Sequence, residues 1–252
     1  MTDSQIRQAA QLLLDARAQR KPITALPADC RPTSEEQAYA VQDIVIASLG
    51  PIGGWKVGAS SHDGNPNCAP LPASGVMKSP VRLSSGDYPL RGIEAEIGYR
   101  FKRDLPPRDQ PYTLAEVLDA VGSVHPIIEL IESRYTDRTQ VDFCSALADS
   151  LSHGGLIFGE GRETGFAINQ LEQTAEVTFN DSTAFQGKGA NPAGDILRLL
   201  VWLANHGARR QGGIRAGQIV TTGSCSGVTF ADPGTDVSAH LAGLGWVKVT
   251  FC

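Results

Sequence analysis

The sequence of 252 residues predicts an α+β fold with a predominantly β body. Three observations lead to this fold class. Apolar residues recur at helical spacing over the first fifty residues, whereas from residue 51 onward short apolar segments are separated by glycine and proline. Strands and helices do not alternate regularly, and no G-x-G-x-x-G or Walker loop occurs, which argues against the doubly wound nucleotide-binding folds. We therefore expect a helical appendage over residues 1–50 and a β-rich catalytic domain over residues 51–252.

Four helices are expected, two of them in the appendage. The first has an apolar face, and the second opens with a capping pattern from Ser34 to Gln37 and ends at Gly50. In the body, Thr113 begins a capping box, while a further helix is framed by Asn191 as N-cap, Pro192 at its first position and Gly207 past its end. Strands are expected at residues 54–59, 92–101, 126–132, 155–160, 175–180, 218–223 and 246–251.

Composition and charge narrow the function classes. The chain has 22 lysines and arginines against 27 aspartates and glutamates, a net charge of -5 and no basic run, so a nucleic-acid partner is not expected. Its apolar runs are too short to span a membrane, and its charged N-terminus does not resemble a signal peptide. Five cysteines without a C-x-x-C pair argue against a disulfide scaffold and a cysteine zinc site. The expectation is a cytoplasmic enzyme with a small-molecule substrate.

Three glutamates in apolar strands are the first candidates for chemistry. Glu94 and Glu96 stand two residues apart in "GIEAEIGYRF", so both carboxylates leave the same face of the strand. Glu129 interrupts the apolar run "PIIELIE", where an unpaired acid costs several kcal/mol. Solvent, flanking lysines or arginines, or a bound cation would make this arrangement tolerable. Three oxygen donors without cysteine or histidine suit Mg²⁺ or Mn²⁺, and acids that are exposed or paired with lysine or arginine are the simpler alternative.

Lys56 and one glycine-rich loop are the next candidates. Lys56 lies between Trp55 and Val57 in "GWKVGA", where it is either an ordered site residue or a surface lysine whose stem covers apolar area. A lysine that is desolvated beside a cation could have a lowered pKa and move protons. The loop at residues 221–227 ends a strand with small and hydroxyl residues, including Thr222, Gly223 and Ser224. It could approach a ligand closely, or it is a plain turn.

Several ordered segments resemble the 2-keto-4-pentenoate hydratase and 4-oxalocrotonate decarboxylase family of the fumarylacetoacetate hydrolase superfamily. They are "GWKVGAS", "RGIEAEIGYRFKRDLP", "PIIELIESR", "ADSLSHGG", "VWLANHG" and "GQIVTTGSCSGV", and the resemblance covers roughly residues 35–252. It implies a mixed β-sandwich or β-roll body of the fumarylacetoacetate hydrolase C-terminal type with an N-terminal helical portion. It also implies a divalent metal and a homo-oligomer, or a complex with a related lyase.

The resemblance also assigns roles to residues. The family's metal ligands match Glu94, Glu96 and Glu129, its active-site lysine matches Lys56, and its serine matches Ser152, with Asp149 in the same segment. The implied activity is a metal-dependent hydratase for a small 2-hydroxydienoic or 2-oxoalkenoic acid, as in meta-cleavage degradation of aromatic compounds. The alternatives are a 4-oxalocrotonate-type decarboxylase, an acylpyruvate hydrolase and a catalytically silent partner subunit.

One departure from the family bears on hydration. The family usually carries an acid after the lysine that helps to place or activate water, and Ala73 or Ser74 stands there in this chain. Metal binding and enolate stabilisation should survive this change, because they depend on other residues. If hydration survives as well, another acid must replace the missing one, and Asp149 and Glu132 are the candidates.

Overall fold

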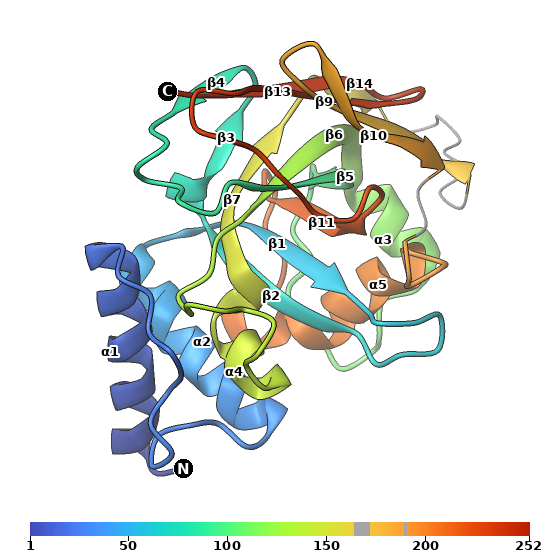
Figure 1. Ribbon diagram of the computed structural model, residues 1–252. Helices are drawn as coiled ribbons and strands as arrows, with labels where there is room; N and C mark the ends of the chain where they lie inside the picture. Colours follow the sequence, from blue (N-terminus) through green and yellow to red (C-terminus); the bar gives the residue numbers. More distant parts are fainter. Residues whose placement is uncertain (164–171, 189–190) are drawn as a thin grey trace.

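Two β-sheets form the body of the protein, as the computed structural model in Figure 1 shows; the structure describes residues 1–163, 172–188 and 191–252. In both sheets parallel and antiparallel pairs are mixed: β1 pairs with β11, β3 with β7 and β4 with β14 in parallel. The nine-stranded sheet has the order β2 (Asn67–Pro72), β1 (Ile52–Gly58), β11 (Ile219–Ser224), β5 (Gly92–Phe101), β6 (Val121–Ile131), β7 (His153–Phe158) and β3 (Val76–Lys78), with β12 (Thr229–Phe230) beside β5 and β8 (Arg162–Glu163) beside β6. The five-stranded sheet has the order β10 (Ser182–Lys188), β9 (Thr174–Phe179), β13 (Asp236–Leu241), β14 (Gly245–Phe251) and β4 (Val81–Leu83).

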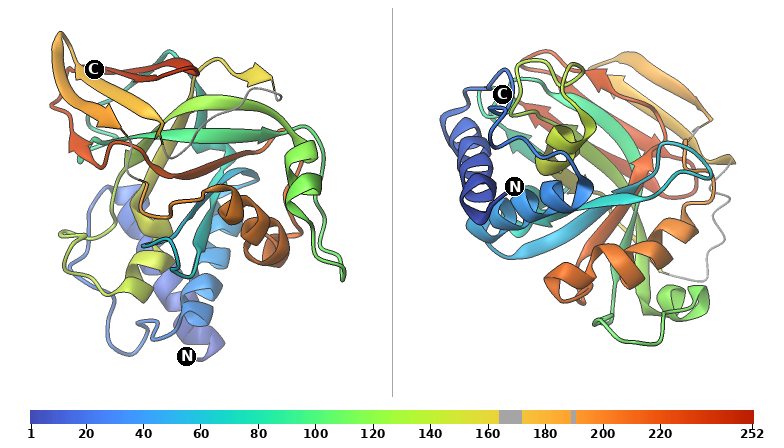
Figure 2. Two further views of the ribbon diagram at one scale, coloured as in Figure 1. Left: turned by 90° about the vertical axis from the view of Figure 1, so that its right-hand side faces the viewer. Right: turned by 90° about the horizontal axis from the view of Figure 1, so that it is seen from below.

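The helices lie around these sheets. Figure 2 shows the two N-terminal helices on the side of the molecule away from the five-stranded sheet. The helices are α1 (Asp3–Gln19), α2 (Glu35–Leu49), α3 (Leu114–Ala120), α4 (Phe143–Ala148) and α5 (Leu197–Trp202), and the shorter turns are η1 (Ala73–Gly75), η2 (Ser150–Ser152), the π-helical η4 (Leu203–Gly207) and η5 (Arg209–Gln211). None of the helices in the described part of the chain is long and apolar enough to cross a membrane.

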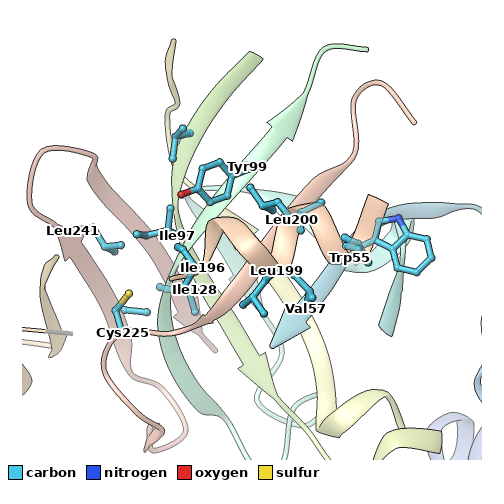
Figure 3. Packing of buried hydrophobic residues seen from close by; sticks show 14 of the residues in the cluster. Trp55, Val57, Ile97, Tyr99, Ile128, Ile196, Leu199, Leu200, Cys225 and Leu241 are labelled. Atoms are coloured by element: carbon cyan, nitrogen blue, oxygen red, sulfur yellow. The ribbon is translucent and has the colours of Figure 1, made fainter. Parts of the chain in front are cut away.

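The main core lies between the two sheets and α5. In β5 the residues that alternate with the glutamates, such as Ile97 and Tyr99, are buried there. Figure 3 shows Trp55 and Val57 of β1 beside Leu199 and Leu200 of α5 in the same cluster. Because side chains alternate across a strand, burying this set on one face directs Lys56, Glu94 and Glu96 to the other face.

A separate apolar cluster holds the N-terminal helices. Ala9 and Leu13 of α1 and Val41 of α2 are buried against Leu147 of α4 and against Tyr135. The helices thus pack on each other and on α4, and Tyr39 of α2 also packs against the main core. The division into an appendage over residues 1–50 and a domain over residues 51–252 remains a prediction.

Most sequence-based expectations about the elements are confirmed. The α+β class with a sandwich-like β body is confirmed, and so are the caps of two helices: Ser34 accepts from the Gln37 amide, and Thr113 forms a complete capping box with Glu116. All five cysteines are free thiols. β5 has the predicted bounds, whereas β6 begins at Val121, before residue 126, because its first residues pair with the end of β5.

The prediction of a helix starting at Pro192 is wrong. α5 begins at Leu197, with Ile196 rather than Asn191 as N-cap. The Asn191 side chain accepts from the Ala193 amide at 3.0 Å and donates to the carbonyl of Thr222 at 2.8 Å, so it ties a turn to the end of β11. The sequence also did not predict helix α4 or strands β2, β3, β4, β8, β10, β12 and β13; β10 is largely exposed and has no apolar alternation to reveal it.

Candidate metal centre

Three carboxylates meet on one face of the nine-stranded sheet. Glu94 of β5 stands directly opposite Glu129 of β6 in the antiparallel register, and Glu96 follows on the same face of β5. One carboxylate oxygen from each residue lies within 4.8 Å of the others. We call these residues the triad. Glu96 and Glu129 are buried and Glu94 is half-buried, so the charges are largely removed from water.

Lys56 is the basic side chain at the triad. Its Nζ lies 2.6 Å from Oε1 of Glu129 and donates to the carbonyl of Leu151 at 3.3 Å. Strand β1 places it there, because Lys56 pairs with Thr221 of β11, the strand that lies between β1 and β5. The Leu151 carbonyl belongs to a turn in which Ser150, Leu151 and Ser152 all have left-handed backbone, with φ values of 52°, 53° and 63°. Such backbone is costly for residues with a Cβ, and here it positions an acceptor at the site.

Glu96 is fixed by the end of β11. The Thr221 hydroxyl donates to Oε2 of Glu96, and the Gly223 amide donates to the same oxygen at 3.1 Å. Gly223 has a φ of +94°, a conformation that favours glycine, and its backbone can therefore turn its amide toward the carboxylate. Glu96 thus reaches the site with one oxygen engaged by two donors.

Glu129 is held from a second side by His153. Nδ1 of His153 lies 3.0 Å from Oε1 of Glu129, and burial lowers the pKa of His153 to about 4. The imidazole is therefore neutral near pH 7, and it carries its hydrogen on Nδ1 to donate to the ionised Glu129. Nε2 is then a buried acceptor with no hydrogen-bond partner among the described residues.

The electrostatics of the triad are unbalanced without a cation. Burial raises the pKa of Glu94, and burial followed by repulsion from Glu129 and Glu94 raises that of Glu96 well above the usual value. Burial alone would raise the pKa of Glu129 too, but the charge of Lys56 and the contact with His153 lower it to about 2. Burial likewise opposes the charge of Lys56, yet Glu129 raises the pKa of this lysine above its usual value. One lysine therefore compensates only part of the charge of three acids.

The donor set fits a hard divalent cation. Three carboxylate oxygens lie close enough to share one ion, and Mg²⁺ and Mn²⁺ prefer such oxygen ligands and keep further positions for water or substrate. The simpler alternative, acids paired with lysine, is present too, but it accounts only for Glu129. Glu94 and Glu96 have no lysine or arginine ion pair in the described part of the chain.

A pocket of about 110 Å³ opens at the triad. Besides the three glutamates and Lys56, its wall includes Gly223 and Ser224, two of the residues expected to contact substrate. The third, Thr222, is fully buried, and its hydroxyl donates to the carbonyl of Ile97 at 3.2 Å, away from this wall. We call this space the triad pocket.

Three other predicted residues are placed elsewhere by their contacts. Asp149 accepts from the backbone amide of Arg134 at 3.1 Å and forms a buried ion pair with its guanidinium. Ser152 is the buried last residue of the left-handed turn, and its carbonyl accepts from the Glu132 amide at 2.8 Å. Glu132 accepts from the amides of Leu90 and Arg91 at 2.7 and 2.8 Å. None of Asp149, Ser152 and Glu132 is part of the described wall of the triad pocket.

Sequence reasoning missed two residues that touch the triad. Thr221 was recognised in its loop but not as the partner of Glu96, although strand alternation puts it on the same face as Lys56, its neighbour in the register. His153 has no signal in the sequence that links it to Glu129, and the pairing of Ile131 with His153 brings its ring toward that carboxylate. Ala73 and Ser74, where the family usually carries an acid, are exposed on η1.

Comparisons with known proteins find relatives in the same family that the sequence motifs resemble. The chain is 29% identical over 262 residues to a 2-keto-4-pentenoate hydratase from Paraburkholderia xenovorans (strain LB400), covering 100% of this chain and 96% of that protein. A 4-oxalocrotonate decarboxylase from Pseudomonas putida G7, solved with magnesium and adipate, superimposes with a TM-score of 0.86 at 25% identity over 100% of this chain and 99% of that one. A protein from Oleispira antarctica assigned as a fumarylacetoacetate isomerase/hydrolase shares the fold, with a TM-score of 0.60 at 18% identity over 79% of this chain and 93% of that one. No family model matches the chain.

Proposed function

We infer that the chain belongs to the family of 2-keto-4-pentenoate hydratases and 4-oxalocrotonate decarboxylases, and on that premise we propose that it is a divalent-metal-dependent hydratase. Its substrate would be a small 2-hydroxydienoic or 2-oxoalkenoic acid. One observation carries the proposal: three buried or half-buried carboxylates converge within 4.8 Å beside a single lysine. Glu94, Glu96 and Glu129 would hold Mg²⁺ or Mn²⁺. The bound ion would supply a Lewis acid that stabilises negative charge on the substrate oxygens.

Lys56 is the acid–base group in this proposal. It is the one titratable residue besides the triad in the described wall of the pocket, and its Nζ donates to Oε1 of Glu129 at 2.6 Å. In the free protein the acids keep it protonated, so it begins as a proton donor or as a contact for the substrate carboxylate. A cation on the triad would oppose that effect and bring the pKa of Lys56 down, as proton exchange with a substrate carbon requires.

The end of β11 would help to position the substrate. The Gly223 amide holds Glu96, and the hydroxyl of the next residue, Ser224, lies at the pocket wall beside Glu94. The half-buried Leu151 also lines this wall and limits the water that can reach Lys56. These residues favour a small planar acid whose anionic end meets the triad and Lys56.

A 4-oxalocrotonate-type decarboxylase is the second candidate. Hydration needs a group that deprotonates water, and the wall of the triad pocket, as far as it is described, has no acid beyond the triad. The two nominated acids, Asp149 and Glu132, are engaged elsewhere. Loss of CO₂ from a vinylogous β-keto acid needs mainly an electron sink, so it could proceed without such a group. The likeness to the solved decarboxylase favours the same alternative.

Parallel assays would separate the candidates. Purified protein with Mg²⁺ would be given 2-hydroxypenta-2,4-dienoate and 4-oxalocrotonate, and the absorbance and product mass would be followed. The proposal expects a gain of one water. Loss of CO₂ without any hydrated product would establish the decarboxylase, and isotope exchange at carbon without net product would leave only a tautomerising activity. No reaction with either compound would favour a silent partner subunit.

Lys56 has its own test. Lys56→Met should lower kcat by about 10²–10⁴-fold, as expected for loss of an acid–base group, while Mg²⁺ still binds by calorimetry. Lys102→Met, at an exposed lysine, is the matched control. A normal rate in Lys56→Met would show that Lys56 is only a counter-ion for Glu129.

The proposal also includes the assembly and location of the protein. We expect a homo-oligomer, or a complex with a related lyase, in the cytoplasm. Sedimentation of the protein with and without such a lyase would test the assembly.

A further inference from the structure

A second cavity, separate from the triad pocket, lies between α1 and the β body. Its volume is about 310 Å³, close to three times that of the triad pocket, and the described walls of the two share no residue. Three arginines line it: Arg17 and Arg20 near the end of α1, and Arg134 beyond the end of β6. We call it the arginine cavity. Its size reaches the lower end of the range of ordinary small-molecule sites, roughly 300–1,000 Å³.

The charges of this cavity are not balanced by its own residues. Three guanidinium groups face two carboxylates, those of Asp87 and Glu132. Asp87 forms an ion pair with Arg20, and Glu132 is satisfied by two backbone amides. Arg134 is paired with Asp149 behind the wall and also donates to backbone carbonyls. Each of these charged groups therefore already has a partner.

Arg17 is the exception. Its Nη2 donates to the carbonyl of His153 at 3.2 Å, which uses one of five N–H donors. Asp149 and Glu132 are near enough to favour its charge, but Arg17 has no ion pair in the described part of the chain. Burial and the neighbouring charge of Arg134 both act against its protonated form. A partly desolvated cation that lines a cavity and has most of its donors unbonded within the described residues can recognise a carboxylate.

The remaining walls indicate what the carboxylate would be attached to. Apolar groups line the cavity at Ala16, Pro22, Leu83 and Pro89, and Tyr88 adds an aromatic ring. A bare inorganic anion would leave this surface in contact with water, whereas an organic acid would cover it. A merely structural role for Arg17, tying α1 to β7 through the His153 carbonyl, would need one donor and explains neither the apolar walls nor the excess charge.

We propose that the arginine cavity is a second binding site, in which Arg17 holds the carboxylate of a small organic acid and the apolar walls hold its body. The site is independent of the reaction at the triad. The probe is benzoate, which joins a carboxylate to an apolar ring, and inorganic phosphate serves as the anion without such a body.

Calorimetry on the Glu94→Gln/Glu96→Gln variant removes metal-dependent binding at the triad from the measurement. Benzoate should bind this variant more tightly than phosphate does. Adding Arg17→Gln should weaken benzoate binding on the order of tenfold to hundredfold, as loss of a charged hydrogen bond predicts, whereas Arg17→Lys should retain part of it. Arg7→Gln, at an exposed arginine on the same helix, is the matched control and should bind benzoate normally.

Other results would overturn the proposal. Benzoate that binds only when the triad is intact would belong to the triad pocket. Equal affinity for phosphate and benzoate would exclude recognition of an apolar body, and unchanged benzoate affinity in Arg17→Gln would exclude Arg17. Arg17→Gln in the otherwise wild-type protein should bind Mg²⁺ normally, which shows that the variant is folded and that the triad is unaffected.

Discussion

The triad pocket and the arginine cavity each take one acid from the end of β6 and stabilise it differently. Glu129 contacts two side chains, Lys56 and His153, and its pKa falls to about 2. Glu132, three residues later, contacts two backbone amides, and burial raises its pKa. Glu129 lies within β6 and Glu132 directly follows its last residue, so the end of one strand serves two sites of opposite charge. The triad pocket has an excess of carboxylates, and the arginine cavity has an excess of guanidinium groups.

His153 is the residue that both regions contact. Its ring nitrogen Nδ1 lies 3.0 Å from Oε1 of Glu129 at the triad. Its backbone carbonyl accepts from Arg17 and Arg134 on the side of the arginine cavity. The two sites therefore differ in the sign of their excess charge, although one residue contacts both. Substitutions that affect one site and spare the other test this contrast.

Glu129→Gln should have the largest effect. It removes one proposed metal ligand and the counter-ion of Lys56, so Mg²⁺ affinity should fall at least about a hundredfold. The free energy of unfolding without metal should fall as well, by up to about 3–5 kcal/mol, because a buried ion pair is broken on one side. Calorimetry and urea unfolding measure the two effects.

Glu163→Gln, at an exposed glutamate of β8, is the control for Glu129→Gln and should change neither quantity. Benzoate binding to the arginine cavity should also be unaltered in Glu129→Gln. Unchanged Mg²⁺ affinity in this variant would contradict the triad as the metal centre.

The second prediction concerns pH. The raised pKa values of Glu94 and Glu96 mean that their contribution to stability is complete below the usual value of 4.5 and is lost as the pH rises through the raised values. Glu129 acts in the opposite sense, since its contribution is present above 4.5 and is lost as the pH falls toward about 2. Mg²⁺ binds the ionised carboxylates, so the stabilisation by Mg²⁺ should grow as the pH rises above 4.5.

Urea unfolding from pH 4.5 to 8, in EDTA and in Mg²⁺, measures that difference. The Glu94→Gln/Glu96→Gln variant should show no such growth, because the groups that exchange protons for the cation are gone. A Mg²⁺ increment that is constant over this range in the wild-type protein would contradict the raised pKa values.

The third prediction addresses the arginine cavity. Glu132→Gln removes a negative charge from the cavity wall, so benzoate should bind a few-fold more tightly, and the weaker acceptor for the Leu90 and Arg91 amides should cost about 1–2 kcal/mol of stability. Mg²⁺ affinity should stay within about twofold, since Glu132 is not at the triad. A loss of Mg²⁺ affinity comparable to that of Glu129→Gln would show that the two regions form one site.

The sequence was sufficient for those parts of the site that lie within single strands. Alternation in β5 placed Glu94 and Glu96 on one face, and the apolar surroundings of Glu129 marked it as an acid that needs a partner. Both inferences use only local periodicity and the cost of burying charge, which a sequence displays directly.

Contacts between strands were beyond the sequence. Thr221 reaches Glu96 because β11 pairs with β5, and His153 reaches Glu129 because β7 pairs with β6. Asn191 resembles a helix cap, yet it donates to the end of β11 instead, since tertiary partners can override a local signal. The wall of the arginine cavity is built from α1 and from segments far from it in the sequence, so no single segment predicts the cavity.

The smallest expected effect comes from Arg138, a half-buried cation near the triad. Its guanidinium lies 5.9 Å from the ring centre of Phe230, whose strand β12 pairs with β5 just before Glu94. Burial raises the pKa of Glu94 most, and Arg138, like Lys56, acts to lower it. When Glu94 is already ionised, the lowering of its pKa by Arg138 no longer changes its charge, and the remaining effect of Arg138 is to repel a divalent cation.

Arg138→Gln should therefore strengthen Mg²⁺ binding about twofold at pH 8 and low salt. The effect should disappear at 1 M salt, where such charges are screened. Arg7→Gln is again the control, and calorimetry at the two salt concentrations gives the comparison. Weaker Mg²⁺ binding in Arg138→Gln at pH 8 would mean that Arg138 supports the triad through contacts rather than through its charge.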